Sequence, residues 1–443
     1  MCKKVILILC LASYAGSFLT AQGNAKSNTN NPCDAALADA QFGLGNGDTK
    51  SAASNPSESR CSVSWTMPVW SEIVNLSWPI GFHSDYENTR GGHYMIELVP
   101  KGETANQWSQ MVTVSGEKGL ASNPNLDEIK FSYQMVSGFK GVCPDTFSSQ
   151  PIGPTKISGH DAYVAWVGCG TVIPDGSGPR GEGSTHSESA LIVSIHGTND
   201  YYTVQWAERG PASSQPLVFD SAKWGDRLQK LNPIKICPLV PGEAAPYPSC
   251  ADKKPVTSIS TVKPIFSELV SYSYPSGFYQ GSESSKNDRY LIEMLPDGEP
   301  SALYSQKIVV IGNKGFSAYP NMSALKGAQL RADGFKALCP DTYSSKQISL
   351  AKVNGHDAYI EWAGCGSVKY GGGAHSESSL IVSIQGKDDN YIIQWAERGT
   401  ASSQPIAYDE AKWKDRLKKL IPVKICPLVP GEREPYPSCV NQK

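Results

Sequence analysis

The 443-residue sequence lacks most of the features by which an activity is recognised. Its formal net charge is only −2, which gives no electrostatic reason to expect nucleic acid or an anionic membrane as partner. It has no CxxC pair, so neither a zinc knuckle nor a thioredoxin-like redox site has support. It has no GxSxG elbow and no HExxH motif, so two common hydrolase signatures are missing.

Long hydrophobic runs are also absent beyond the first residues. Two lysines precede a short apolar stretch, Val5–Ala15, and small residues follow it. This pattern predicts a cleavable secretory signal peptide at residues 1–21. The stretch is too short for a permanent membrane anchor, and Leu9 precedes Cys10 where a lipoprotein needs a small residue. We therefore expect a protein without a membrane span that is secreted or periplasmic.

Cysteine, by contrast, is plentiful. Of twelve cysteines, Cys2 and Cys10 leave with the signal peptide, and an even number remains. In an exported chain this count predicts disulfides. The remaining cysteines are Cys33, Cys61, Cys143, Cys169, Cys237, Cys250, Cys339, Cys365, Cys426 and Cys439.

The second half of the chain repeats the first. GHDAYVAWVGCG at residue 159 returns as GHDAYIEWAGCG at residue 355, HSESALIVSI returns as HSESSLIVSI, and KICPLVPGEAAPYPSC returns as KICPLVPGEREPYPSC. The offset falls from 196 to 189 residues within one Gly-rich loop, as a surface connection tolerates. We predict module 1 at residues 61–250, a linker at 251–260 and module 2 at 261–443. A low-complexity extension at 22–60, expected to be mostly unordered, precedes them.

Equal cysteine spacing in both modules favours local disulfides. The pairs Cys143–Cys169 and Cys339–Cys365 are each 26 residues apart, and Cys237–Cys250 and Cys426–Cys439 are each 13 apart. Cys33–Cys61 is then the remaining pair. Crossed pairings within a module, which would strap the tail onto the sheet, stay open.

Strands dominate the pattern of each module. RYLIEMLP, HDAYIEW and NYIIQWAE alternate with period two, whereas SLIVSI is apolar and β-branched throughout. Helical spacing appears in YDEAKWKDRLKKLI, with its counterpart in module 1, and a second helix is predicted near 125–139 and 321–335. The expected fold class is α+β: two tandem modules, each an antiparallel sheet backed by helices, with a disulfide-closed C-terminal tail.

This order of elements resembles the PsbP-like fold, named for a lumenal photosystem II subunit and shared with exported bacterial proteins. The resemblance rests on the SYPSGF stretch, the GHDAYIEW strand, the paired strands SLIVSIQG and YIIQWAE, and the closing helix around Trp413. It covers most of each module. The disulfide-closed tail after the helix departs from that fold. Many members are not enzymes, so the resemblance implies the fold and leaves the function open.

Few polar residues in the repeat are placed to carry chemistry. In HSES, His186 and Glu188 are two residues apart, so they would share a strand face and could bind a metal or move a proton. Asp161 is a possible third ligand; the alternative is a polar strand entrance. The module 2 counterparts are His375, Glu377 and Asp357.

Three other motifs have simpler interpretations. GHDAY places His160 and Asp161 on opposite faces, as at a turn that opens a core strand. The Gly-rich loop PDGSGPRGEGS lacks the Lys-Ser/Thr of a phosphate-binding P-loop. In QWAER we expect a core tryptophan followed by a solvated Glu208–Arg209 pair.

Three functions follow as hypotheses. The first is an exported, non-enzymatic tandem-module protein that binds an envelope or extracellular partner, without cofactor, nucleic acid or membrane span. The second is a metal-dependent or hydrolytic enzyme that uses the HSES face. The third is a structural component of the envelope.

Overall fold

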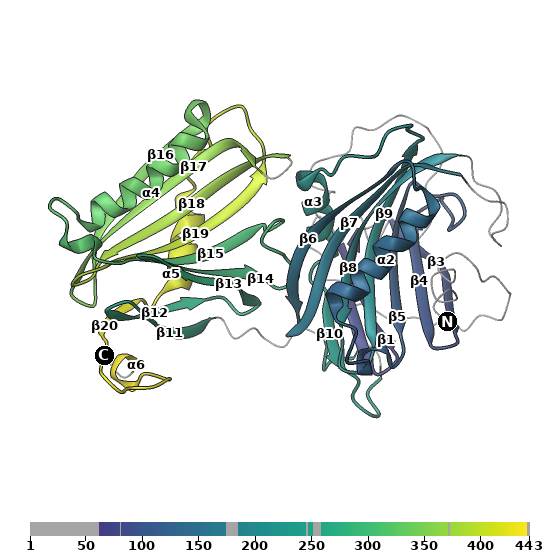
Figure 1. Cartoon of the computed structure of the whole chain (residues 1–443), viewed down its shortest axis with the longest axis horizontal. Coiled ribbons are helices and arrows are strands. Elements are labelled where there is room, and N and C mark those ends of the chain that lie inside the picture. The colour runs from purple at the N-terminus through teal and green to yellow at the C-terminus, as the bar shows by residue number, and fades with distance from the viewer. Residues whose placement is uncertain are drawn as a thin grey trace, which may run out of the picture. The chain divides into compact units, whose positions relative to one another are not determined.

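The computed structural model describes residues 62–79, 81–173, 185–244, 247–250, 258–370 and 373–440 (Figure 1). The predicted signal peptide, the low-complexity extension, Cys33 and Cys61, the Gly-rich loop of module 1 and residues 251–257 of the linker lie outside the described residues. Apart from Asp220–Ala222, one compact unit holds the residues up to Lys253 and a second holds those from Lys254. These units are the two tandem modules.

Module 1 contains a seven-stranded antiparallel sheet in the order β3-β4-β5-β9-β8-β7-β6 and a three-stranded sheet in the order β1-β2-β10. The large sheet comprises β3 (Phe82–Arg90), β4 (His93–Pro100), β5 (Gln110–Glu117), β6 (Phe147–Ile157), β7 (His160–Val172), β8 (His186–His196) and β9 (Tyr201–Pro211). The small sheet comprises β1 (Ser62–Val69), β2 (Glu72–Pro79) and β10 (Lys235–Pro238). The helices are α2 (Glu128–Val142) and α3 (Ser221–Leu231).

Module 2 repeats this architecture, with the orders β13-β14-β15-β19-β18-β17-β16 and β11-β12-β20. The large sheet comprises β13 (Phe278–Lys286), β14 (Arg289–Pro296), β15 (Gln306–Asn313), β16 (Tyr343–Val353), β17 (His356–Tyr370), β18 (Gly373–Gln385) and β19 (Asn390–Thr400). The small sheet comprises β11 (Ile259–Ile265), β12 (Glu268–Tyr274) and β20 (Lys424–Pro427). The helices are α4 (Ala324–Leu338), α5 (Glu410–Leu420) and the short α6 (Pro437–Val440).

Each large sheet is covered on both faces, as Figure 1 shows for α4 lying across β17 and β18. One face packs against α2 or α4. The opposite face packs against the small sheet and α3 or α5, so that in module 2 Trp413, Ile425 and Tyr272 join one core with Trp395. This burial on both sides explains why β18, with its SLIVSI segment, reads as a continuous apolar run.

The predicted helices are confirmed, and their ends follow capping chemistry. The carboxylate of Asp127 accepts a hydrogen bond from Lys130 N at 2.7 Å at the start of α2, and Ser323 and Asp409 cap α4 and α5 in the same way. The last turn of α2 leads into Cys143, which is bonded to Cys169 on β7. The helix is therefore tied covalently to the sheet that it covers.

The four disulfides in the described residues are local: Cys143–Cys169, Cys237–Cys250, Cys339–Cys365 and Cys426–Cys439. The crossed pairings do not occur. The tail first adds a short strand to the small sheet, where Lys235–Pro238 pairs with β2, and the second disulfide then closes the Pro-rich segment. In the described part of the chain no helix is both long and apolar enough to cross a membrane.

Candidate functional site

The two HSES segments lie near the starts of β8 and β18. In each segment the histidine and glutamate side chains share the sheet face that α2 or α4 covers, as the alternation of a strand predicts. The His186 Nε2 atom is 3.4 Å from Glu188 Oε2, and the His375 Nε2 atom is 3.5 Å from Glu377 Oε2. The expected shared face is confirmed in both modules.

The proposed third ligand is wrong. Asp161 stands at the other end of β7, eight residues before Cys169, which pairs directly with Glu188. At roughly 3.3 Å per residue the two carboxylates are about 26 Å apart. Asp161 is exposed and forms an ion pair with Lys156, and Asp357 does the same with Lys352. Among the described residues no group of three or more histidine, cysteine, aspartate or glutamate side chains could hold a metal ion.

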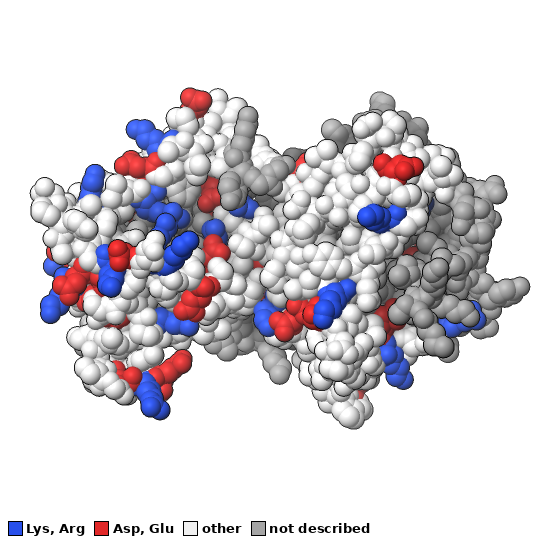
Figure 2. Space-filling view, viewed as in Figure 1, with Lys and Arg blue, Asp and Glu red and all other residues white. Residues whose placement is uncertain are grey.

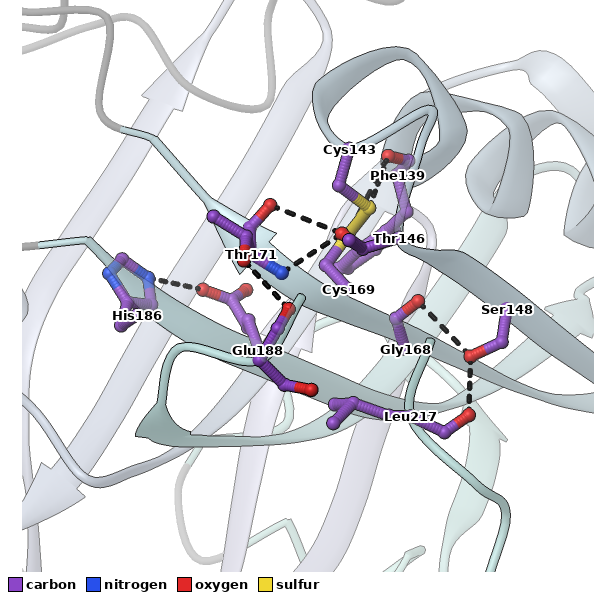
Figure 3. The surroundings of a disulfide bond; sticks show 11 residues. Phe139, Cys143, Thr146, Ser148, Gly168, Cys169, Thr171, His186, Glu188 and Leu217 are labelled. Carbon is purple, nitrogen blue, oxygen red and sulfur yellow. Dashed lines mark hydrogen bonds and ion pairs between the residues drawn. A yellow bond between two sulfur atoms is a disulfide. The ribbon is translucent and has the colours of Figure 1, made fainter. Parts of the chain in front are cut away.

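The true neighbours of the glutamate are an arginine and an aromatic ring. Arg209 lies directly opposite Glu188 on β9, and its Nε donates to Glu188 Oε2 at 3.2 Å. The Arg209 guanidinium also lies 3.9 Å from the centre of the Trp108 ring. Together with the disulfide beside Glu188 (Figure 3), these side chains form a row across β7, β8 and β9 that ends at the loop before β5. We call it the anchor row: Cys169, Glu188, Arg209 and Trp108.

The anchor row of module 2 is Cys365, Glu377, Arg398 and Tyr304. Tyr304 replaces the tryptophan, and its hydroxyl donates to Glu377 Oε2 at 3.0 Å. Arg398 lies 3.7 Å from the Tyr304 ring centre and its Nη1 donates to the carbonyl of Ala302 at 3.1 Å. These contacts fasten the loop between β14 and β15 onto the sheet.

The electrostatics of the row suit a fixed carboxylate. Burial alone would raise the pKa of Glu377, but the hydrogen bond from His375 and the positive charges of Arg398 and Lys307 outweigh burial, so that the pKa is lowered. Burial and the neighbouring Glu377 charge raise the pKa of Tyr304, so the phenol stays a neutral donor. An ionised acceptor thus faces the donors Arg398 and Tyr304, which is the arrangement of a structural anchor.

A second polar cluster explains the GHDAY motif. The buried carboxylate of Glu72 accepts hydrogen bonds from Thr198 N at 3.1 Å and from Thr198 Oγ1 at 2.9 Å, and His160 Nε2 lies 3.6 Å away. Asp200 accepts from Ser71 N at 3.0 Å. A Cβ atom on Gly197 would lie 2.2 Å from Glu72 Oε2, so only glycine fits there. These hydrogen bonds attach the turn between β8 and β9 to Ser71 and Glu72, at the start of β2 in the small sheet.

The expectation for QWAER is half right. Trp206 is core, being 1% exposed. Glu208 and Arg209, however, do not form a solvated pair, because consecutive residues of a strand point to opposite faces. Glu208 turns toward α3, where Lys223 lies at 2.5 Å and Arg227 at 2.7 Å, whereas Arg209 joins the anchor row.

Sequence reasoning missed the arginine and the aromatic residue of the anchor row. A usable signal existed: both modules place an arginine at the end of the strand that follows HSES, and adjacent antiparallel strands bring such residues opposite one another. Trp108 and Tyr304 come from loops, and no periodicity predicts where a loop folds back.

No protein-family model matches the sequence, and no curated protein matches it. Among solved structures the chain is similar to the Ran-binding protein Mog1p of Saccharomyces cerevisiae, with 14% identity and a TM-score of 0.23 over 36% of this chain and 84% of that one. It is similar to the cyanobacterial PsbP protein CyanoP of Synechocystis sp. PCC 6803, with 13% identity and a TM-score of 0.23 over 39% and 92%.

It is also similar to the T6SS immunity protein TplEi of Pseudomonas aeruginosa, with 9% identity and a TM-score of 0.22 over 82% of this chain and 99% of that one. A PsbP protein is thus among the solved structures to which the chain is similar. These likenesses concern the fold alone.

Proposed function

We propose that this protein is an exported, non-enzymatic binding protein whose two modules engage the same kind of partner at the cell envelope. The polar residues that suggested catalysis are engaged in holding each module together. What the two modules repeat on their surfaces is a different feature, the loop of the disulfide-closed tail.

This tail loop presents apolar side chains to solvent in both modules. It has the same letters twice, PLVPGE, although the next two residues differ between the modules. Leu239 and Val240 are 38% and 44% exposed, and Leu428 and Val429 are 40% and 43% exposed. Apolar exposure repeated at the same two positions of both modules is typical of a binding surface, and this is the observation that carries the proposal.

A disulfide and two hydrogen bonds also constrain the described part of the tail loop. The Cys237–Cys250 disulfide closes it, and Ser249 donates to Glu243 from its backbone N at 2.7 Å and from its hydroxyl at 2.5 Å. Glu432 and Ser438 repeat these bonds. A loop fixed in advance loses little conformational entropy on binding, and two such loops on one chain gain avidity.

The disulfides support an exported location. Four disulfides fit an oxidising environment outside the cytosol. The predicted signal peptide would deliver the chain there. On the face drawn in Figure 2, basic and acidic side chains are interspersed, with no single-sign surface of the kind that nucleic acid requires.

The test compares loop variants for binding to the envelope fraction of the native cells. We expect L239S/V240S or L428S/V429S alone to weaken binding by about 100-fold or more, because avidity is lost, and the combined variant to abolish it. V218S is the matched control, since Val218 is 89% exposed but lies outside the tail loop. Undiminished binding by the combined variant contradicts the proposal, and recovery of the protein as an abundant insoluble component favours the structural role.

A further inference from the structure

Each large sheet has two edge strands, which have a neighbour on one side only: β3 and β6 in module 1, and β13 and β16 in module 2. At corresponding ends of the two sheets, β6 and β16 each pair with the strand that follows in the chain. The outer edge of such a strand presents unpaired N–H and C=O groups to which another extended chain can bond. Both strands are 11 residues long, which is enough for a partner strand to pair along them.

The two edges differ in whether they can accept a partner. β6 carries Pro151 and Pro154, and each proline removes an N–H donor. At the equivalent positions β16 has Gln347 and Leu350. Leu350 is 75% exposed. At this end of the two sheets the duplication therefore yielded one blocked edge, β6, and one open edge, β16.

The region between the covering helix and the edge strand also differs between the two modules. In module 1 a pocket of about 20 Å³, enough for a water molecule, lies between α2 and β6 beside Ala165. Module 2 has Glu361 where module 1 has Ala165, directly opposite Gln347. Glu361 is only 8% exposed, and among the described residues its Oε2 atom has no hydrogen-bond partner.

This carboxyl group is in an unfavourable position. Burial, followed by the charge of Asp333 on α4, raises its pKa above the ordinary value for glutamate. A buried acceptor without a donor destabilises the fold unless a partner supplies the donor. Asp333 adds further negative charge at the same edge, so the complementary group is a cation.

We propose that β16 is a docking edge, to which a strand of a partner protein adds while placing a lysine or arginine side chain against Glu361. A strand added to β16 lies two inter-strand spacings, roughly 10 Å, from β17. The long stem of an arginine or lysine on the face covered by α4 can cross over Gln347 to the carboxylate. Backbone bonds supply affinity, and the buried ion pair selects the cationic residue. The proposal goes beyond the function proposed above, because it concerns module 2 alone and none of the tail-loop residues.

The first experiment uses the full chain and two synthetic probes. One is a short peptide of alternating threonine and valine with a central arginine, and the other has norleucine in place of the arginine. We expect the arginine peptide to slow amide hydrogen exchange in β16, and not in β6, and to bind about tenfold or more tightly than the norleucine peptide. Equal binding of the two peptides, or protection elsewhere, overturns the proposal.

Variants taken from module 1 separate the two components of the site. Q347P/L350P gives β16 the prolines of β6, a substitution that the same fold already accepts, and should abolish binding of both peptides. E361Q should remove only the preference for arginine. The reverse variant, P151Q/P154L/A165E, should create the site in module 1. It keeps the proposal testable if the prolines of Q347P/L350P unfold module 2.

Two results would be decisive against it. If β16 is already protected in the free protein and the protein dimerises with rising concentration, a second copy is the occupant and the partner-strand proposal fails. If the reverse variant folds and binds neither peptide while E361Q behaves as wild type, the edge has no selective role. Tail-loop variants are expected to bind both peptides normally, so failure here is distinguishable from failure of the proposed function.

Discussion

The helix-covered faces of the two modules differ in the polarity of their side chains, although both modules have the same fold. On the side of the sheet that carries the helix, four positions that are apolar or aromatic in module 1 have more polar side chains in module 2. The corresponding pairs are Met111 and Lys307, Met135 and Arg331, Ala165 and Glu361, and Trp108 and Tyr304. The opposite faces hardly differ, since Trp166, Trp206 and Trp224 match Trp362, Trp395 and Trp413, all buried.

The polar face of module 2 is stable because nearly every charge has a partner. Lys307 Nζ is 3.0 Å from Glu293 Oε1, and Arg331 Nε donates to Gln394 Oε1 at 2.5 Å. The Oε2 atom of Glu361 is among the buried polar atoms of module 2 that have no hydrogen-bond partner in the described part of the chain, and it lies at the edge that we propose for docking. A duplicated module can therefore acquire a new surface on one face while the other face keeps the core intact.

The largest expected effect tests whether each module owns its stability. Replacing Cys339 and Cys365 by alanine should destabilise module 2 by about 3 kcal/mol, because the unfolded chain loses its constraint. In calorimetry the unfolding transition of module 2 should fall by roughly 6–12 °C. The transition of module 1 should not move, and an equal shift of both would show that the modules unfold as one unit.

A second prediction compares how much the two anchor rows contribute to the unfolding free energy of their modules. E377Q should destabilise module 2 by about 2 kcal/mol, because Arg398, His375 and Tyr304 all lose a charged acceptor, whereas E188Q should cost module 1 about 1 kcal/mol. Denaturant titration of each variant measures the difference. Equal losses would mean that the Tyr304 hydroxyl adds nothing to the anchor.

The pH dependence distinguishes Glu361 from Glu377. Since the folded state raises the pKa of Glu361, that state binds its proton more tightly, and the unfavourable contribution of Glu361 grows as the pH rises above the ordinary value of 4.5. E361Q should therefore stabilise module 2 by about 1 kcal/mol at neutral pH and by less near pH 4.

Glu377 has the opposite sign. Its pKa is lowered in the folded state, so its contribution is present above 4.5 and is lost as the pH falls through the lowered value. Thermal unfolding of E361Q and E377Q across this range measures both effects. A stabilisation by E361Q that is the same at every pH would contradict the assignment, and A165Q in module 1 provides the matched control.

The smallest expected effect concerns the pocket of module 1. Ser132 is 1% exposed, its hydroxyl has no hydrogen-bond partner among the described residues, and module 2 has Ala328 at this position. S132A should change the unfolding free energy of module 1 by no more than about 0.5 kcal/mol, because no bond is lost. A large loss would reveal a bond through a water molecule in the pocket.

Much of the fold was predictable because its signals are local. The alternation in RYLIEMLP and the spacing of Trp413, Leu417 and Leu420 each depend on residues a few positions apart. The disulfide pairing could be favoured because both modules repeat the same spacing. The site was less accessible: the shared face of His186 and Glu188 followed from the strand period, but the wrong choice of Asp161 shows that the period does not say which end of a neighbouring strand comes near.

The sequence by itself determined that the chain is a duplicated, disulfide-bonded, sheet-rich protein, because repetition, cysteine spacing and hydrophobic period are properties of the linear order. Only the tertiary structure decided that Arg209 and Trp108 complete the anchor row, that Glu208 and Arg209 separate, and that β16 is an open edge beside a buried carboxyl group. Those facts depend on strand order and on loops that fold back, and both are fixed by packing between residues far apart in the chain.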